Sequence, residues 1–301
     1  MRPWVILGVT VATALIARLL IQAGLDQVAA FYVGLPMVAS TALFWTDRPE
    51  RRVVWRNHVG EATLIIFFTA IVLFEGFICF VFAAPIYYLA VAFAFFINLQ
   101  IFKLKTRKGS NKAMAATLPL LALMLSAEGL TAATTLDRQN EAAYRAVTNQ
   151  TVAELKANMA RPIRFDQPRH WFLTIFPMPV KVSAGTLKAG DVHVLEFIYK
   201  RWFFTNTHEG ALQLRIDQVG PDHVETTVVA NTSYLSGYMT IEGTRVEFTE
   251  RPDGSTAVSL KLRYERKLDP VWYFAPLQRY AMNKAAAYLM DTIILRKVAN
   301  G

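Results

Sequence analysis

The chain has 301 residues, 53% of them apolar, and its mean hydropathy of +0.28 is high for a wholly water-soluble protein. The net charge of +9 is spread over both halves of the chain, which argues against the concentrated basic patch of a nucleic-acid-binding protein. The single cysteine, Cys79, excludes an internal disulfide, and the five histidines lack the spacing of a metal site. We therefore expect no nucleic-acid partner, no metal and no cofactor.

The first 132 residues contain five apolar runs, each close to the roughly 20 residues that a helix needs to cross a bilayer. The runs cover residues 3–22, 28–45, 61–82, 86–102 and 113–131. The third and fourth runs are nearly continuous, and we divide them at Ala83, Ala84 and Pro85 because proline disfavours a helical predecessor. The sequence therefore predicts an all-α membrane domain of about five transmembrane helices over residues 1–132.

Charges in the linkers predict how this domain is oriented. Linkers 46–60 and 103–112 are rich in Lys and Arg, whereas the connections at 23–27 and 83–85 have neither. Lys and Arg near the ends of transmembrane helices favour the cytoplasmic side. Five crossings then predict a multi-pass protein of a bacterial inner membrane whose C-terminal part lies in the periplasm. One crossing fewer would leave that part in the cytoplasm.

Three ionisable residues lie within the predicted membrane helices. Glu75 is near the middle of the third run, and Arg18 and Glu128 are near the outer ends of the first and fifth, where they could pair. One interpretation is a site for a proton or a ligand. The other is that Arg18 and Glu128 reach the interface while Glu75 forms a hydrogen bond to a polar side chain of another helix.

After the apolar runs, polar residues dominate, with apolar positions at roughly helical spacing. This pattern predicts a helical stalk over residues 133–159, which could also form a dimer contact. A short helix is expected at 166–175, where Asp166 can cap the first turn and Pro168 fits within it.

A series of strands comes next, since apolar and polar residues alternate along several segments. These strands are expected at 190–204, 211–217, 222–231, 238–250 and 257–265. Turn residues at 220–222 and 252–254 leave only short loops, which predicts an antiparallel meander. The amphipathic segment 272–297 then predicts a long helix that covers the apolar face of the sheet.

Two adjacent segments carry a resemblance to a known superfamily. GTRVEFTERPDGSTAVSLKLRYERK at 243–267 and LDPVWYFAPLQRYAMNKAAAYLMDTII at 268–294 resemble the last hairpin and the closing helix of START-like (SRPBCC) proteins, which include polyketide cyclases and lipid-transfer domains. The resemblance covers about residues 150–297. It implies an α+β helix-grip domain over 160–301, in which an antiparallel sheet wraps around the last helix. The best candidate for the strand that opens this fold is 160–166.

The resemblance also implies a cavity between the sheet and the last helix that accepts a lipid or another hydrophobic small molecule. Candidate residues of its wall are Phe197, Tyr199, Tyr264, Trp272 and Tyr288, for which plain core packing is the alternative. A second aromatic group could enter the lipid interface instead, where Trp and Phe are favoured. This group consists of Trp171, Phe172, Phe176, Trp202 and Phe203.

Three functions are compatible with these features. The leading hypothesis is a membrane-tethered domain that binds a lipid or hydrophobic ligand and presents or transports it. The second is a membrane sensor or assembly partner that binds protein, as a homo-oligomer or with a membrane protein. The third is a cyclase-like enzyme on a membrane-soluble substrate, although the sequence has no GxSxG motif, no glycine-rich phosphate loop and no residue that we assign to catalysis.

Overall fold

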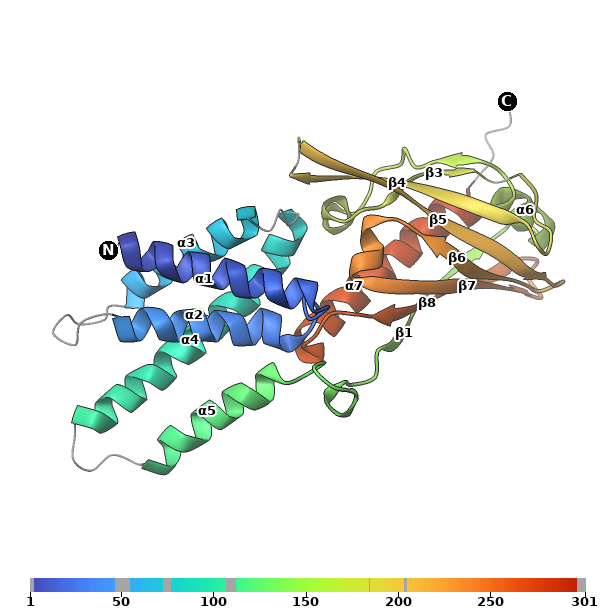
Figure 1. The fold of residues 1–301 in the computed structure, drawn as a ribbon. Coiled ribbons are helices and arrows are strands. Elements are labelled where there is room, and N and C mark those ends of the chain that lie inside the picture. Colours follow the sequence, from blue (N-terminus) through green and yellow to red (C-terminus); the bar gives the residue numbers. More distant parts are fainter. Residues whose placement is uncertain are drawn as a thin grey trace. The chain divides into compact units, whose positions relative to one another are not determined.

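The computed structural model describes residues 3–46, 55–72, 77–106, 112–183, 185–202 and 205–296. The chain forms two compact units. The first comprises residues 1–136 and 268–274, and the second comprises residues 137–267 and 275–301. Figure 1 shows a helical first unit, coloured blue to green, and a second unit built on a β-sheet.

Five α-helices form most of the described part of the first unit. They are α1 (Pro3–Gln22), α2 (Leu35–Thr46), which follows a π-helical turn at Ala30–Gly34, α3 (Trp55–Val72), α4 (Phe77–Thr106) and α5 (Lys112–Ser126); a 3-10 turn follows at Ala132–Thr134. Among the described residues, two helical stretches, Pro3–Gln22 and Phe80–Phe102, are long and apolar enough to cross a membrane. The prediction of about five transmembrane helices is therefore corrected to two helices that meet this criterion.

The remaining helices fall short for identifiable reasons. The apolar helix Ala30–Thr46 is too short, and α5 has 15 residues, which at about 1.5 Å per residue is well under the roughly 30 Å of a bilayer core. The first two turns of α3 contain Arg56, His58 and Glu61. The turn that we expected at Ala83–Pro85 is also wrong, because Pro85 lies inside α4.

Buried polar side chains join the helices of the first unit. Ser40 on α2 and His58 on α3 are both almost fully buried, and a hydrogen bond of 2.8 Å joins Ser40 Oγ to His58 Nε2. Trp45 Nε1 donates to Asn98 Oδ1 at 2.7 Å, which connects α2 to α4. Because an unsatisfied polar group is costly in an apolar interior, these bonds favour one arrangement of α2, α3 and α4.

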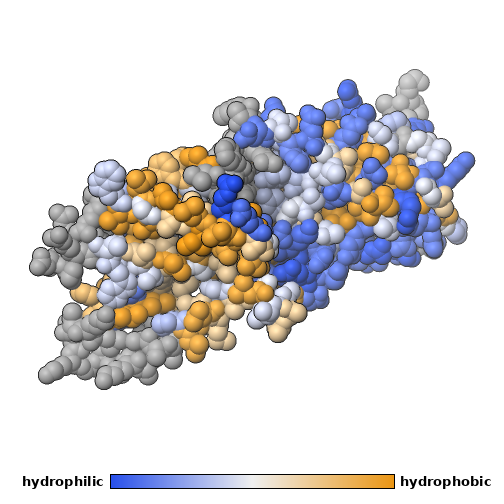
Figure 2. All heavy atoms as spheres, in the orientation of Figure 1, coloured by the Kyte–Doolittle hydropathy of each residue, from blue (hydrophilic) through white to orange (hydrophobic). Residues whose placement is uncertain are grey.

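Large apolar side chains are exposed on these helices. Trp4, for example, is 82% exposed. The others include Leu7, Val11, Leu15, Leu19, Val38, Phe67, Phe68, Leu89, Phe96, Leu120, Leu123 and Met124. Figure 2 shows apolar residues, in orange, gathered over the first unit. Exposed apolar surface of this extent is uncommon on monomeric water-soluble proteins.

The second unit contains one eight-stranded antiparallel sheet in the order β1-β8-β7-β6-β5-β4-β3-β2. Its strands are β1 (Gln139–Thr148), β2 (Ile163–Arg164), β3 (Pro179–Ser183), β4 (Val192–Trp202), β5 (Thr205–Val219), β6 (His223–Asn231), β7 (Met239–Glu250) and β8 (Thr256–Arg266). The five predicted strands correspond to β4 through β8. Both predicted turns are present, between β5 and β6 and between β7 and β8.

The predicted helical stalk at 133–159 is wrong over much of its length. Residues 139–148 form β1, which pairs with β8 along its whole length, so β1 opens the sheet and not the segment 160–166. Only α6 (Val152–Met159) is helical there, and it begins with a capping box in which Thr151 and Glu154 exchange hydrogen bonds. The short helix expected at 166–175 is a 3-10 turn, η3 (Trp171–Ile175).

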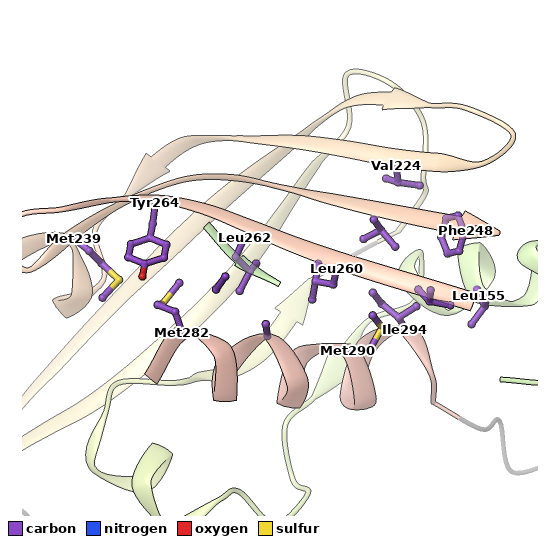
Figure 3. Close-up of a cluster of buried hydrophobic side chains, with 14 residues drawn as sticks. Leu155, Val224, Met239, Phe248, Leu260, Leu262, Tyr264, Met282, Met290 and Ile294 are labelled. Carbon is purple, nitrogen blue, oxygen red and sulfur yellow. The ribbon is translucent and has the colours of Figure 1, made fainter. Parts of the chain in front are cut away.

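The long helix α7 (Val271–Leu289) lies against one face of the sheet and continues as a π-helical turn, η5 (Met290–Ile294) (Figure 1). Met282, Ala286, Met290 and Ile294 recur every four residues and are buried. In Figure 3 the side chains of Met282 and Met290 point toward those of Leu260 and Leu262 on β8. An antiparallel sheet wrapped on a long C-terminal helix is the predicted helix-grip fold.

Asn158 attaches the end of the helix to the rest of the second unit. The side chain is buried, and its Nδ2 donates to the carbonyl oxygens of Ile294 at 2.9 Å and Arg296 at 3.0 Å. These carbonyls belong to the last residue of η5 and to a residue just after it, where carbonyls have no helical partner. Asn158 therefore links α6 to the end of η5.

We predict that Asn158→Ala lowers the free energy of unfolding by about 1–3 kcal/mol, since it leaves two carbonyls without their donor. Asn283→Ala is the matched control because Asn283 is exposed on α7, and it should change stability by under about 0.5 kcal/mol. Denaturant unfolding of the full chain in detergent measures both. Equal effects of the two substitutions would contradict the role of Asn158.

Candidate functional site

A cavity of about 90 Å³ lies between the sheet and the end of the C-terminal helix. Strands β2 to β8 supply most of its wall, and Leu289, Ile293 and Ile294 close it from the helix side. Its other lining residues are Met159, Ile163, Val182, Leu187, His193, Leu195, Leu214, Ile216, Thr226, Thr244, Val246, Leu260 and Leu262. The cavity is therefore almost entirely aliphatic.

The cavity lies where two core clusters meet. One cluster contains Leu260, Leu262 and Val246, and the other contains Leu195 and Val182. Leu289 and Ile293 are only partly buried and pack against both clusters. These two side chains therefore connect the two clusters on the helix side of the cavity.

The polar groups of the cavity are few and already engaged. Thr226 and Thr244 face each other across β6 and β7, and a hydrogen bond of 2.8 Å joins their Oγ1 atoms. His193 Nε2 forms a hydrogen bond of 2.7 Å to the carbonyl oxygen of Thr186. An apolar pocket with two or three polar groups is typical of a site for a hydrophobic molecule.

The loop between β3 and β4 covers one side of the cavity. Leu187 lies on this loop and lines the cavity. Asp191 holds the loop in place, because its carboxylate accepts hydrogen bonds from Thr186 Oγ1 and, at 2.9 Å, from the backbone N–H of Lys188. These hydrogen bonds lower the pKa of the Asp191 carboxyl below its ordinary value.

The five predicted wall residues lie elsewhere. None of them is among the residues that line the cavity. Phe197 and Tyr288 belong to one core cluster and Tyr264 to the other, where burial raises the pKa of the Tyr264 phenol. Tyr199 stacks on the ring of Tyr234 at 4.7 Å. Trp272 is half exposed and belongs to the first unit.

The packing of the core explains why the five aromatic side chains do not line the cavity. Large aromatic side chains fill the space between sheet and helix, so the space that remains is lined by smaller aliphatic ones. Strands β5 and β8 supply four of these aliphatic lining residues, Leu214, Ile216, Leu260 and Leu262. Contact between a ligand and the five aromatic candidates stays a prediction.

Three of the five predicted membrane-interface residues, Trp171, Phe172 and Phe176, form an aromatic cluster. Trp171 is 72% exposed, and Phe172 lies 5.1 Å from Phe176 and 5.0 Å from Tyr280, measured between ring centroids. The side chain of Trp202 and the whole of Phe203 lie outside the described residues. Insertion of this cluster into lipid stays a prediction.

The three ionisable residues that we expected within membrane helices differ in their surroundings. Glu128 Oε1 accepts a hydrogen bond of 2.8 Å from the backbone N–H of Val271, the first residue of α7. A carboxylate at this position stabilises a helix. Pairing of Glu128 with Arg18, and the alternative that both side chains reach the interface, stay predictions. Arg18 is exposed, and Glu75 lies outside the described residues.

The charged residues on the outer face of the sheet neutralise one another. Glu225 pairs with Arg245 at 3.4 Å and with Arg263 at 3.0 Å. Glu247 pairs with Arg245 at 2.9 Å and with Lys261 at 3.3 Å. Arg263 and Lys261 thus belong to a partly exposed, ion-paired face of the sheet.

We predict that Asp191→Asn speeds amide hydrogen exchange in the loop 185–191, because the charged acceptor of the Lys188 N–H is lost. Asp253→Asn is the control, since Asp253 accepts similar bonds from Ser255 in the turn between β7 and β8. Exchange of loop 185–191 that is the same in the Asp191 variant and in the wild type would contradict this role.

The same loop should depend on pH in one direction. The Asp191 carboxyl has an ordinary pKa of 3.8 and a lower pKa in the folded protein. Its stabilisation is therefore present above about pH 4 and is lost as the pH falls through the folded value. Exchange measured between pH 3 and 7, corrected for its intrinsic pH dependence, should show loop protection that falls only at the acid end.

Comparisons with known proteins give matches at the level of solved structures. No protein-family model and no curated protein matches the chain. Major latex-like protein 151 from Panax ginseng is 15% identical, with 50% of this chain and 98% of that one covered, at a TM-score of 0.29. A START superfamily protein from Mycobacterium smegmatis is 11% identical over 51% and 96% of the two chains, at a TM-score of 0.32. Protein CV1439 from Chromobacterium violaceum is 15% identical over 49% and 95%, at a TM-score of 0.32.

Proposed function

We propose that the second unit is a START-like domain that binds a hydrophobic ligand, such as a lipid chain, between its sheet and its C-terminal helix. The observation that carries this proposal is the aliphatic cavity bounded by β2–β8, Leu289 and Ile293. Voids are rare in protein interiors because the lining atoms lose dispersion contacts there. An apolar ligand that enters the cavity restores those contacts.

The cavity volume limits what the site holds without rearrangement. About 90 Å³ is smaller than the roughly 300–1,000 Å³ of typical ligand pockets, so it admits only a short apolar group. A longer chain enters only if partly buried side chains move aside. Leu187, Leu289 and Ile293 are the lining residues best suited to this, since they are half-buried and lie on a loop and at the helix end.

We propose further that the first unit attaches the chain to a membrane. The exposed apolar side chains of α1 to α5 support this proposal, as do the two helices of sufficient length. Two exposed tryptophans at helix ends also support membrane attachment. Trp45 lies at the end of α2 beside Asn98 of α4, and Trp55 begins α3 beside Phe95 of the same helix. Tryptophans are enriched where a membrane protein meets the headgroups.

The direction of the helices supports a periplasmic second unit in a bacterial inner membrane. α2 ends, and α3 begins, near Asn98 of α4, and the basic linkers 46–60 and 103–112 adjoin these ends. The opposite end of α2 adjoins Ser126, where α5 ends. Since basic linkers favour the cytoplasm, the chain then leaves the first unit on the other side.

Ligand binding is tested with a photoreactive fatty acid that carries a diazirine in its chain, added to the full chain in detergent. We predict adducts on peptides that contain lining residues, suppressed by unlabelled fatty acid. Ile293→Trp fills the cavity and should reduce labelling at least about fivefold, since the added ring takes the space of the chain.

Ile198→Trp is the matched control, because it makes the same exchange at a position that is 48% exposed and outside the cavity. It should label as the wild type does. Labelling confined to the helices of the first unit, or labelling that Ile293→Trp leaves unchanged, would show that the cavity is not the binding site.

Membrane attachment and side are tested separately from ligand binding. The full chain should stay in the membrane pellet after extraction at alkaline pH. A reporter fused after residue 301 that is active only in the periplasm should be active, and its cytoplasmic counterpart silent. The reverse pattern of reporters would sink the proposed orientation, and extraction into the supernatant would sink the attachment.

A further inference from the structure

β1 forms a long open edge of the sheet. It has ten residues, pairs with β8 on one side without a register shift, and has no neighbour on its other side among the described strands. The opposite edge strand, β2, has two residues. Edge strands expose backbone N–H and C=O groups that can pair with another strand, and β1 has neither proline nor a bulge to prevent this.

The charged residues on the outer face of β1 lack the ion pairs that charged residues form on the neighbouring strands, within the described part of the chain. Glu141 lies opposite Arg263 in the register of β1 and β8, so it shares the face on which Arg263, Lys261 and their carboxylate partners form ion pairs. Glu141 and Arg145 are both exposed on that face. Neither forms a salt bridge with another residue of the part of the chain that the structure describes.

We propose that β1 pairs antiparallel with β1 of a second copy of this chain, about a two-fold axis that passes beside Ala143. In this register Glu141 lies opposite the partner's Arg145, and Arg145 lies opposite the partner's Glu141. Ala143 meets the partner's Ala143. The paired charges thus extend the ion pairs of the outer face across the interface.

The inner face of β1 fits the same register. Ala142, which is fully buried, lies opposite the partner's Tyr144, so a small side chain always faces a large one. Moving the symmetry axis by one residue in either direction places Glu141 opposite the partner's Ala143 or Val147 and loses both charge pairs. A parallel in-register pair would place like charges side by side, which is unfavourable.

A second copy is therefore the occupant that the pattern specifies. A different protein would need its own matching charges, whereas β1 carries both members of the pair two residues on either side of its centre. This inference does not rest on the proposed ligand, so loss of ligand binding would leave it intact.

Disulfide trapping tests the register in the full chain. In a Cys79→Ser background, Ala143→Cys should give a disulfide-linked dimer in membranes under mild oxidation, because directly opposed Cα atoms are about 4.5–5.5 Å apart and disulfides span that distance. Gln139→Cys is the control on the same face of the same strand, where the two copies would be roughly 27 Å apart. It should crosslink only when mixed with Val147→Cys.

Charge reversal tests the pairing without a crosslink. Glu141→Arg or Arg145→Glu alone places like charges opposite each other twice, and should raise the dimer dissociation constant about tenfold. The double reversal restores both pairs and should return the dissociation constant to the wild-type value. Light scattering of the detergent-solubilised chain over a dilution series measures it.

Three results would overturn the proposal. A wild-type chain that is monomeric in membranes and in detergent would show that Glu141 and Arg145 merely keep other strands from this edge. Equal crosslinking of Ala143→Cys and Gln139→Cys alone would rule out the register. A double reversal no better than either single reversal would rule out the charge pairs.

Discussion

The second unit depends on one helix that must cover one face of one sheet. Eight strands present a broad apolar face, and α7 covers it with a stripe that is one helix wide. Met282, Ala286 and Met290 fill the centre of the interface, where the side chains on β8 reach them. Near the end of the helix, the side chains of this single stripe do not fill all of the space over the apolar face of the sheet. The cavity lies there.

The end of the helix is also where its geometry changes. The π-helical turn Met290–Ile294 contains an additional residue per turn, and both Ile293 and Ile294 line the cavity. Such turns are frequent at functional sites in proteins. Asn158 donates hydrogen bonds to the carbonyls of Ile294, in the turn, and Arg296, just after it, so this irregular segment is attached to α6. The helix end is thus fixed at its last residues, while Leu289, one turn earlier, is only partly buried and borders the cavity.

Much of the second unit could be predicted from the sequence because its signals are local. Alternation along β5 and β8, the turn residues Gly220–Asp222 and Pro252–Gly254, and the period of α7 each depend on neighbouring residues. β1 was missed because its inward-facing positions include two alanines, Ala142 and Ala146, which are weakly apolar and favour helices. Pairing with β8 decides its structure, and that contact joins residues more than a hundred positions apart.

The helix ends of the first unit and the residues of the candidate site were predicted less well from the sequence. Hydropathy located the apolar runs but not the helix ends, since Pro85 lies inside α4 and the polar residues near the start of α3 belong to that helix. Aromatic side chains were the natural candidates for a ligand wall, yet Tyr264 and Phe197 occupy space and leave the cavity to Leu289, Ile293 and Leu187. Only three-dimensional packing reveals where a core is not filled.

The proposed site for an apolar ligand is the space between the sheet and the end of the C-terminal helix. Methyl NMR of the full chain in nanodiscs tests it most directly, with isoleucine methyl groups labelled and a saturated fatty acid added. We predict nuclear Overhauser contacts from the alkyl chain to Ile163, Ile216 and Ile293, which line the cavity, and none to the exposed Ile198. Contacts to Ile198 alone, or unchanged methyl signals of Ile293 at saturating fatty acid, would contradict it.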